Sequence, residues 1–149
     1  MQIENKPKLE LDGTGKKVGI VVSRFNREIT QGLLLSAQKF LADVHVAEQD
    51  IKVMSVPGAV ELPVALQKLA ESGKFDFLVA LGCIIRGETP HFDYVAKMAQ
   101  EGALRVMLDY KIPVGFGVLT VENSEQAKVR FHIGGEAAAA ALEFALIKV

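Results

Sequence analysis

The sequence predicts an α/β fold, a three-layer α/β/α sandwich whose middle layer is a four-stranded parallel sheet. Two observations lead to this prediction. Short runs rich in β-branched residues recur four times along the chain, and segments with the period of an amphipathic helix lie between them. Because parallel neighbours need crossover connections, this alternation places helices on both faces of the sheet.

The apolar runs have the length and composition of buried strands. The predicted strands span residues 17–23, 51–56, 77–85 and 112–121. The first helix carries apolar residues at helical spacing from Leu33 to Val44, with Thr30 available as an N-cap. Further helices are predicted at Glu61–Ser72, at about His91–Leu108 and at about Gly134–Ile147. Together these elements predict a doubly wound sheet of the flavodoxin-like type.

Length and composition predict one domain over residues 1–149, with residues 1–15 as an amino-terminal arm. The 17 basic and 18 acidic residues include no basic block that could neutralise a row of phosphates, so nucleic-acid binding is not expected. The lone Cys83 cannot form an intrachain disulfide, and no secretion signal is visible. No apolar run reaches the ~20 residues of a membrane span, so a cytoplasmic protein without membrane contact is expected.

Ligands of doubly wound sheets bind beyond the carboxyl ends of the strands. In this sequence the first three strands end in the segments SRFN, VPGAVEL and RGETPH. These segments bring glycine, proline, aromatic and ionisable residues to one rim of the sheet. A small-molecule site is therefore predicted at that rim.

The segment RGETPH has the pattern of an anion-binding turn. Gly87 permits a sharp turn, Pro90 suits the first position of the coming helix, and the N–H groups of Glu88 and Thr89 can point at one anion beside the helix N-terminus. An ordinary strand-to-helix turn capped by Thr89 accounts for the same residues. His91 falls in the first helical turn, where the dipole disfavours a protonated ring and suits a general base, although a surface or core histidine is the commoner case.

Other rim residues have a functional and a plain interpretation. Phe25 can stack on a flat heterocycle or pack down as a loop residue. Glu61 can contact a ligand or cap the following helix, and Arg130 can pair with a phosphate or remain solvated. No role is predicted for His45, and that of His132 stays open.

Five segments resemble lumazine synthases in order and spacing, over nearly the whole chain. They are SRFN (23–26), VPGAVELP (56–63), GCIIRGETPHFDYVA (82–96), FGVLTVENSEQA (116–127) and GGEAAAAALEFA (134–145). The part IRGETPHFDYV is the most specific. The resemblance implies condensation of 5-amino-6-(D-ribitylamino)uracil with 3,4-dihydroxy-2-butanone 4-phosphate to 6,7-dimethyl-8-ribityllumazine, water and phosphate. This is the penultimate step of riboflavin biosynthesis, and the family needs no metal or organic cofactor.

The resemblance also implies roles for individual residues. His91 matches the proposed acid/base, and Phe116 and Arg130 match residues that the adjoining subunit contributes, with the arginine clamping phosphate. The remaining matches bind substrate, and they are Phe25 and Asn26 in the ring-stacking pocket, Ala59, Val60 and Glu61 along the ribityl chain, Ile84 and Ile85 beside the pyrimidine, and Glu88 and Thr89 at the phosphate.

One departure follows Arg130. Relatives carry a segment of the form GTKxGNKG there, whereas this chain has only FHIGG, residues 131–135, and His132 is a candidate to replace the lost lysines. At Val60 an aromatic is frequent in relatives. The family forms homopentamers with sites between neighbours, and some pair as decamers or assemble into 60-subunit shells, so the size of the assembly stays open. The segment LEL, residues 9–11, would add a strand to a neighbouring sheet, and riboflavin synthase is the candidate protein partner.

Two alternatives remain beside the synthase. An archaeal-type riboflavin synthase has a similar fold and consumes lumazine, although RGETPHFDYV favours the synthase. A catalytically weak paralogue that binds flavin or forms a shell is supported by the lost lysines.

Overall fold

The structure is a computed structural model, and it describes residues 10–149. Its strands are β1 (Val18–Ser23), β2 (Ile51–Val56), β3 (Phe77–Ile85) and β4 (Val114–Val121). They form one sheet in the order β2-β1-β3-β4, and every neighbouring pair is parallel. The predicted four-stranded parallel sheet is confirmed.

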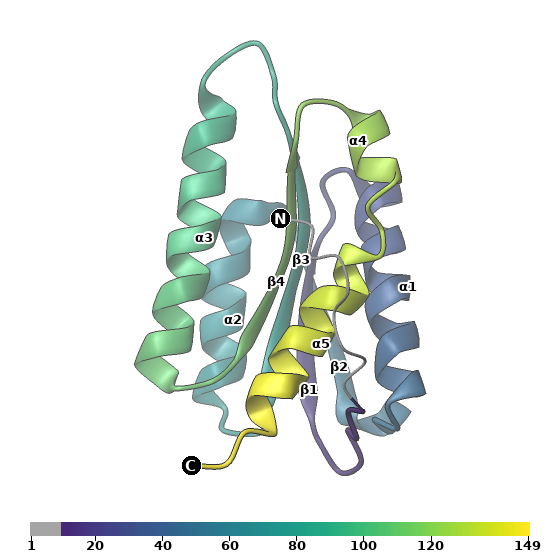
Figure 1. Cartoon of the computed structure of the whole chain (residues 1–149). Coiled ribbons are helices and arrows are strands. Elements are labelled where there is room, and N and C mark those ends of the chain that lie inside the picture. The colour runs from purple at the N-terminus through teal and green to yellow at the C-terminus, as the bar shows by residue number, and fades with distance from the viewer. Residues whose placement is uncertain (1–9) are drawn as a thin grey trace.

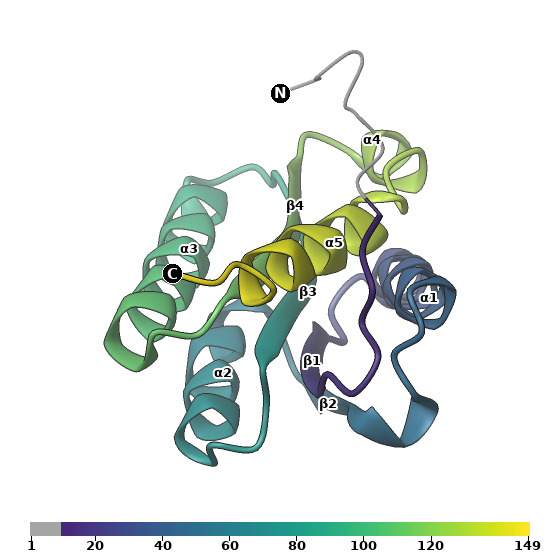
Figure 2. The ribbon, with the colours of Figure 1, turned by 60° about the horizontal axis from the view of Figure 1, so that its bottom comes forward.

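Helices cover both faces of the sheet, as Figures 1 and 2 show. The helices α2 (Leu62–Glu71) and α3 (His91–Tyr110) pack on one face. The helices α1 (Arg27–Asp43) and α5 (Ile133–Ala145) pack on the other, with the short α4 (Ser124–Lys128) on the same side. Short 3₁₀ turns, η1 (Glu48–Asp50) and η2 (Ala59–Glu61), precede β2 and α2. The three-layer sandwich is thereby confirmed.

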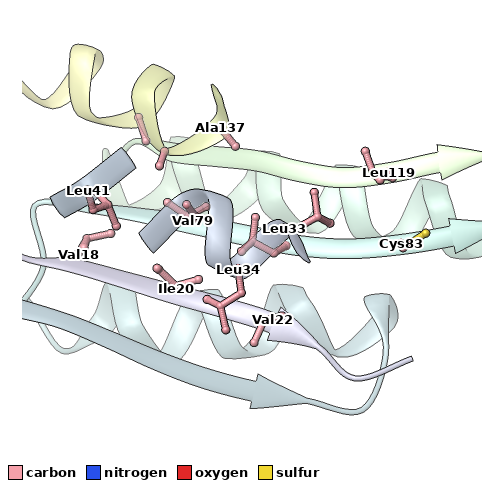
Figure 3. Packing of buried hydrophobic residues seen from close by; sticks show 14 of the residues in the cluster. Val18, Ile20, Val22, Leu33, Leu34, Leu41, Val79, Cys83, Leu119 and Ala137 are labelled. Atoms are coloured by element: carbon pink, nitrogen blue, oxygen red, sulfur yellow. The ribbon is translucent and has the colours of Figure 1, made fainter. Parts of the chain in front are cut away.

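Each face of the sheet buries its own apolar cluster. Alternate residues of β1 and β3, such as Val18, Ile20 and Val79, point toward α1 and α5 (Figure 3). The intervening residues, such as Val21 and Ala80, point toward α2 and α3. Because both faces are covered, the two central strands are apolar along nearly their whole length.

The prediction that all strands are buried was wrong for β2. Only Val56 of this strand is buried, and Lys52, Val53 and Ser55 are exposed. The reason is its place in the sheet, since β2 is an edge strand and pairs within the described chain only with β1. The sequence of a strand does not show whether the strand will lie at the centre or at the edge of the sheet.

Two predicted helix signals also need correction. Thr30 is not an N-cap, because α1 begins at Arg27 and Thr30 lies buried inside its first turn, donating to the Arg27 carbonyl over 3.3 Å. Asn26 holds the N-cap position in a left-handed conformation (φ 60°). Pro90 lies at the N-cap of α3 and not at its first position.

The helices α1 and α5 approach each other closely at two glycines. A Cβ atom on Gly134 would lie 2.0 Å from the Leu33 carbonyl oxygen. The N–H of Gly135 donates to the Ser36 hydroxyl over 3.0 Å. The start of α5 is therefore fixed on α1.

Of the predicted arm strand at residues 9–11, residue 9 lies outside the described residues, residues 10 and 11 belong to no strand of this chain, and Leu11 packs against the core of the α1 face. Within residues 10–149, no helix combines the length and the hydropathy needed to cross a bilayer.

Candidate functional site

The cavity that gathers most of the predicted site residues, called the main cavity below, lies at the carboxyl ends of β1 and β3. Strand order reverses there, which is where doubly wound sheets bind ligands. The main cavity has a volume of about 370 Å³. Loops after β1, β2 and β3 all contribute to it, as the sequence predicts. The lining residues are Phe25, Asn26, Gly58, Ala59, Val60, Glu61, Cys83, Ile84, Ile85, Gly87, Thr89, His91, Phe92 and Val95.

The loop after β1 is held in place by backbone hydrogen bonds to the loop after β2. The N–H of Arg24 donates to the Val56 carbonyl over 2.8 Å, and the N–H of Phe25 donates to the Pro57 carbonyl over 3.0 Å. The Phe25 ring remains 72% exposed and lines the cavity. A broad apolar face is thus available for a flat ring.

Asn26 joins the first loop to β3. Its side-chain amide donates to the Cys83 carbonyl over 2.9 Å. The left-handed backbone that this position requires is one that asparagine adopts more readily than most residues. Asn26 therefore fixes the distance between the aromatic rim and the end of β3.

The loop after β2 presents backbone to the cavity through residues 58–61. Ala59 is buried, and the Glu61 carboxylate accepts a hydrogen bond from the Gly58 N–H over 3.1 Å. Of the two roles that the sequence allows for Glu61, ligand contact or helix capping, this bond is the cap. The polar groups that this loop presents are consequently backbone groups together with the other oxygen atom of the Glu61 carboxylate.

The turn between β3 and α3 brings Gly87, Thr89 and His91 to the cavity, but Glu88 does not line it. The Thr89 hydroxyl accepts from the His91 N–H over 3.4 Å, a long contact in keeping with a weak cap. Within residues 10–149, no hydrogen bond engages the N–H of Glu88 or of Thr89. Two backbone donors beside the N-terminus of a long helix form a place for an anion.

Ile84 and Ile85 form the floor of the cavity at the end of β3. The preceding residue, Cys83, turns its thiol to the opposite face of the sheet, among the residues that pack under α1 and α5 (Figure 3). Burial raises the pKa of this thiol to about 11. Cys83 therefore meets the cavity through its backbone.

Two predicted site residues lie apart from this cavity. Phe116, in the edge strand β4, lines a second hollow of about 650 Å³ between the end of α3 and α5. Arg130 follows α4 and donates to the Gln126 carbonyl. Neither residue lines the main cavity, so the single chain brings together only part of the predicted set.

Sequence reasoning missed Phe92 and Val95, which also line the cavity. With His91 they occupy positions i, i+1 and i+4, so one side of the first turn of α3 faces the cavity. That spacing is the signal that could have found them. Among the described residues, no group of three or more His, Cys, Asp or Glu is placed to hold a metal ion.

Comparison with known proteins identifies the family of the chain. A profile of the 6,7-dimethyl-8-ribityllumazine synthase family matches residues 15–148. The chain belongs to this family. The 6,7-dimethyl-8-ribityllumazine synthase of Nitrosomonas europaea is 49% identical over 136 residues, which are 91% of this chain and 83% of the relative. That of Azoarcus sp. is 46% identical over 142 residues, which are 94% of this chain and 91% of the relative.

The similarity to lumazine synthases extends over all the predicted site residues, from Phe25 to Arg130. The resemblance seen in the sequence segments is thus confirmed as family membership. Phe116 and Arg130 lie within the same family match as the residues of the main cavity, although the single chain separates them.

Proposed function

We propose that this chain is a 6,7-dimethyl-8-ribityllumazine synthase. It condenses 5-amino-6-(D-ribitylamino)uracil with 3,4-dihydroxy-2-butanone 4-phosphate and releases water and phosphate. One observation carries the proposal: in a member of this family, an exposed aromatic ring, the Thr89 backbone at a helix N-terminus and an imidazole line one cavity at the strand-order switch.

Each wall of the cavity fits one part of the reaction. The Phe25 ring is suited to stack on the pyrimidine, and the backbone of Ala59, Val60 and Glu61 to hold the ribityl chain. The N–H groups of Glu88 and Thr89 are suited to bind the phosphate. Holding the two substrates in register supplies much of the acceleration, because it replaces an encounter in solution with an oriented pair.

His91 is the proposed proton carrier. The amino group adds to the ketone and loses water to form an imine, and phosphate leaves as a dianion. The ribitylamino nitrogen then closes the ring on the carbonyl carbon that this elimination leaves, and a second water is released. Each step moves a proton between nitrogen, carbon or oxygen atoms. Imidazole takes up and releases protons near neutral pH, and positioned acid–base catalysis typically contributes about 10²–10⁴-fold in rate.

We further propose a homopentamer in which a neighbouring chain supplies Phe116 and Arg130. The apolar surface around Phe116 supports this arrangement: the side chain of Phe116 is 41% exposed, that of Leu108 68% and that of Phe144 67%. Exposed apolar residues gathered around one hollow are typical of interaction surfaces. The chain would act as one domain with an amino-terminal arm, in the cytoplasm, with riboflavin synthase as the next enzyme.

The two substrates, supplied to the purified protein, test the function directly. We expect the fluorescence of the lumazine product to appear with one phosphate released per product. Absence of turnover together with tight binding of riboflavin would favour the catalytically weak paralogue, which the short FHIGG segment supports. Dismutation of lumazine to riboflavin would favour the archaeal-type riboflavin synthase.

A further inference from the structure

We propose that Arg86 is a positioning residue for this reaction, which holds the turn at residues 87–91 in the geometry that binds phosphate and presents His91. The inference rests on the proposed function, and it concerns a residue outside the predicted site set. Arg86 does not line the cavity and acts through the residues that do.

The turn that Arg86 precedes has no buried side chain to fix it. Residues 86–91 are all exposed, and a Cβ atom on Gly87 would meet nothing within 4 Å. The backbone bond from the Asp93 N–H to the Pro90 carbonyl, at 3.0 Å, lies at its far end. A segment with so few buried contacts is expected to move unless other groups restrain it.

Arg86 supplies such restraints from one side chain. Its Nε donates to the Glu122 carboxylate over 3.1 Å, at the corner between β4 and α4. Its Nη2 lies 3.7 Å from an Asp93 carboxylate oxygen in the first turn of α3. The guanidinium carbon lies 4.4 Å from the centroid of the Phe92 ring, a cation–π contact.

The backbone of Arg86 adds another restraint, because its N–H donates to the Val121 carbonyl over 2.9 Å. Arg86 thus ties the end of β3 to the end of β4 and to α3. Phe92 and Asp93 directly follow His91, so the contacts to them set the orientation of the helical turn that carries the imidazole.

A planar guanidinium suits this role better than an ammonium. It presents several N–H donors in a fixed fork and can stack its plane on an aromatic face at the same time. The ammonium of lysine has no such plane and no such fork. Ion pairs between exposed side chains contribute little to global stability. We therefore expect that loss of Arg86 changes the kinetics of the enzyme much more than its melting temperature.

Steady-state kinetics of the Arg86→Met enzyme test the inference. Methionine keeps an unbranched apolar stem in place of the arginine stem and removes the charge and the fork. We expect kcat/KM for the butanone phosphate to fall by about 10- to 100-fold, because small misplacements near the reacting atoms have effects of that size. The KM for the ribitylaminopyrimidine should change less than twofold, since the loops that carry Phe25 and residues 59–61 are held by other bonds.

Matched variants separate positioning from a general loss of structure. Arg105→Met removes an exposed arginine from α3, where it pairs with Asp109 over 3.9 Å, and should leave the kinetics within twofold of wild type. Glu122→Gln should give a smaller loss of the same kind. The double variant Arg86→Met/Glu122→Gln should be no worse than Arg86→Met, because the two side chains act through one contact.

The opposite results would overturn the inference. Wild-type kinetics in Arg86→Met, an equal rise of both KM values, or additive losses in the double variant would each do so. If Arg86→Met does not fold, Glu122→Gln decides alone: a raised KM for the phosphate substrate supports the inference, and an unchanged KM contradicts it.

Calorimetric titration with inorganic phosphate distinguishes this inference from the proposed function, because it needs no turnover. We expect Arg86→Met to bind phosphate about tenfold more weakly than wild type, as fits a misplaced turn. A wild type that binds phosphate but forms no lumazine would refute the function alone. Equal phosphate binding by wild type and Arg86→Met would refute the positioning role alone.

Discussion

The predicted site has two parts, and a single chain brings the residues of only one of them together. Residues from the loops after β1, β2 and β3 meet in one cavity and are tied to one another by hydrogen bonds. Phe116 and Arg130, which the resemblance assigns to the same reaction, lie outside that cavity. A single chain thus builds the part proposed to face the pyrimidine and the turn proposed to bind phosphate, but not the proposed arginine clamp.

The separation is fixed by packing. The segment that follows Arg130 is held on α1 by Phe131, whose ring occupies the space beside Gly32, and by the close approach at Gly134. Figure 1 shows α4, just before Arg130, on the side of α1 and α5, whereas α3 lies on the opposite side of the sheet. These contacts hold the backbone that follows Arg130 on α1, in keeping with the proposed use of Arg130 by a neighbouring chain.

The largest expected effect lies within the part that one chain assembles. We expect His91→Ala to lower kcat by about 10²–10⁴-fold while the assembly stays intact, because the exposed ring serves proton transfer and not packing. Stopped-flow or steady-state lumazine fluorescence measures the rate. His45→Asn is the control, since asparagine tolerates the positive φ of 72° at that position. Unchanged turnover would remove His91 from the mechanism.

This first part is also the one that the sequence predicts best. The spans of β2 and β3 agree with the structure, and loops at the carboxyl ends of parallel strands must meet at one rim. Phe92 and Val95 share helical spacing with His91, but they were missed because tertiary packing decides which side of α3 faces the cavity. Arg86 was missed because its contact with Glu122 joins segments that are distant in the sequence.

The second part tests whether the site is shared between chains. Arg130→Met should raise the KM for the butanone phosphate by about 10- to 100-fold, since a hydrogen bond to a charged group is worth roughly 1.5–3 kcal/mol. A substrate analogue without phosphate should show no such change. An equal change with that analogue would contradict the clamp role.

Co-expression of the His91→Ala and Arg130→Met chains sharpens this test. If each site takes His91 from one chain and Arg130 from the next, random mixing at equal amounts leaves about a quarter of the sites with both groups, because neighbours in a closed ring are drawn independently. Activity should then recover to about that fraction of wild type. No recovery in a fully mixed assembly would show that each chain uses its own arginine.

A smaller effect is expected where α5 rests on α1. Alanine usually stabilises a helix relative to glycine, but Gly134→Ala would place a methyl group 2.0 Å from the Leu33 carbonyl oxygen. We expect the free energy of unfolding to fall by about 1–3 kcal/mol, as in other overpacked sites. Urea denaturation measures it, with Ala139→Gly in the same helix as the control for helix propensity. A stabilised Gly134→Ala protein would mean that the segment after Arg130 is free to move.

The smallest expected effect concerns the floor of the cavity. Because burial raises the pKa of Cys83 to about 11, the folded chain keeps its thiol protonated at pH 8, and the thiol points away from the cavity. Ellman's reagent should therefore react slowly with the native protein and fully with the unfolded one.

The unfolded thiol ionises near its ordinary pKa of 9.0, so the free energy of unfolding should fall as the pH rises from about 9 toward 11. Cys83→Ala should lack this component of the fall. Fast labelling of the native thiol would mean that the cavity opens through the sheet, and the part built by one chain would then be less rigid than its hydrogen bonds indicate.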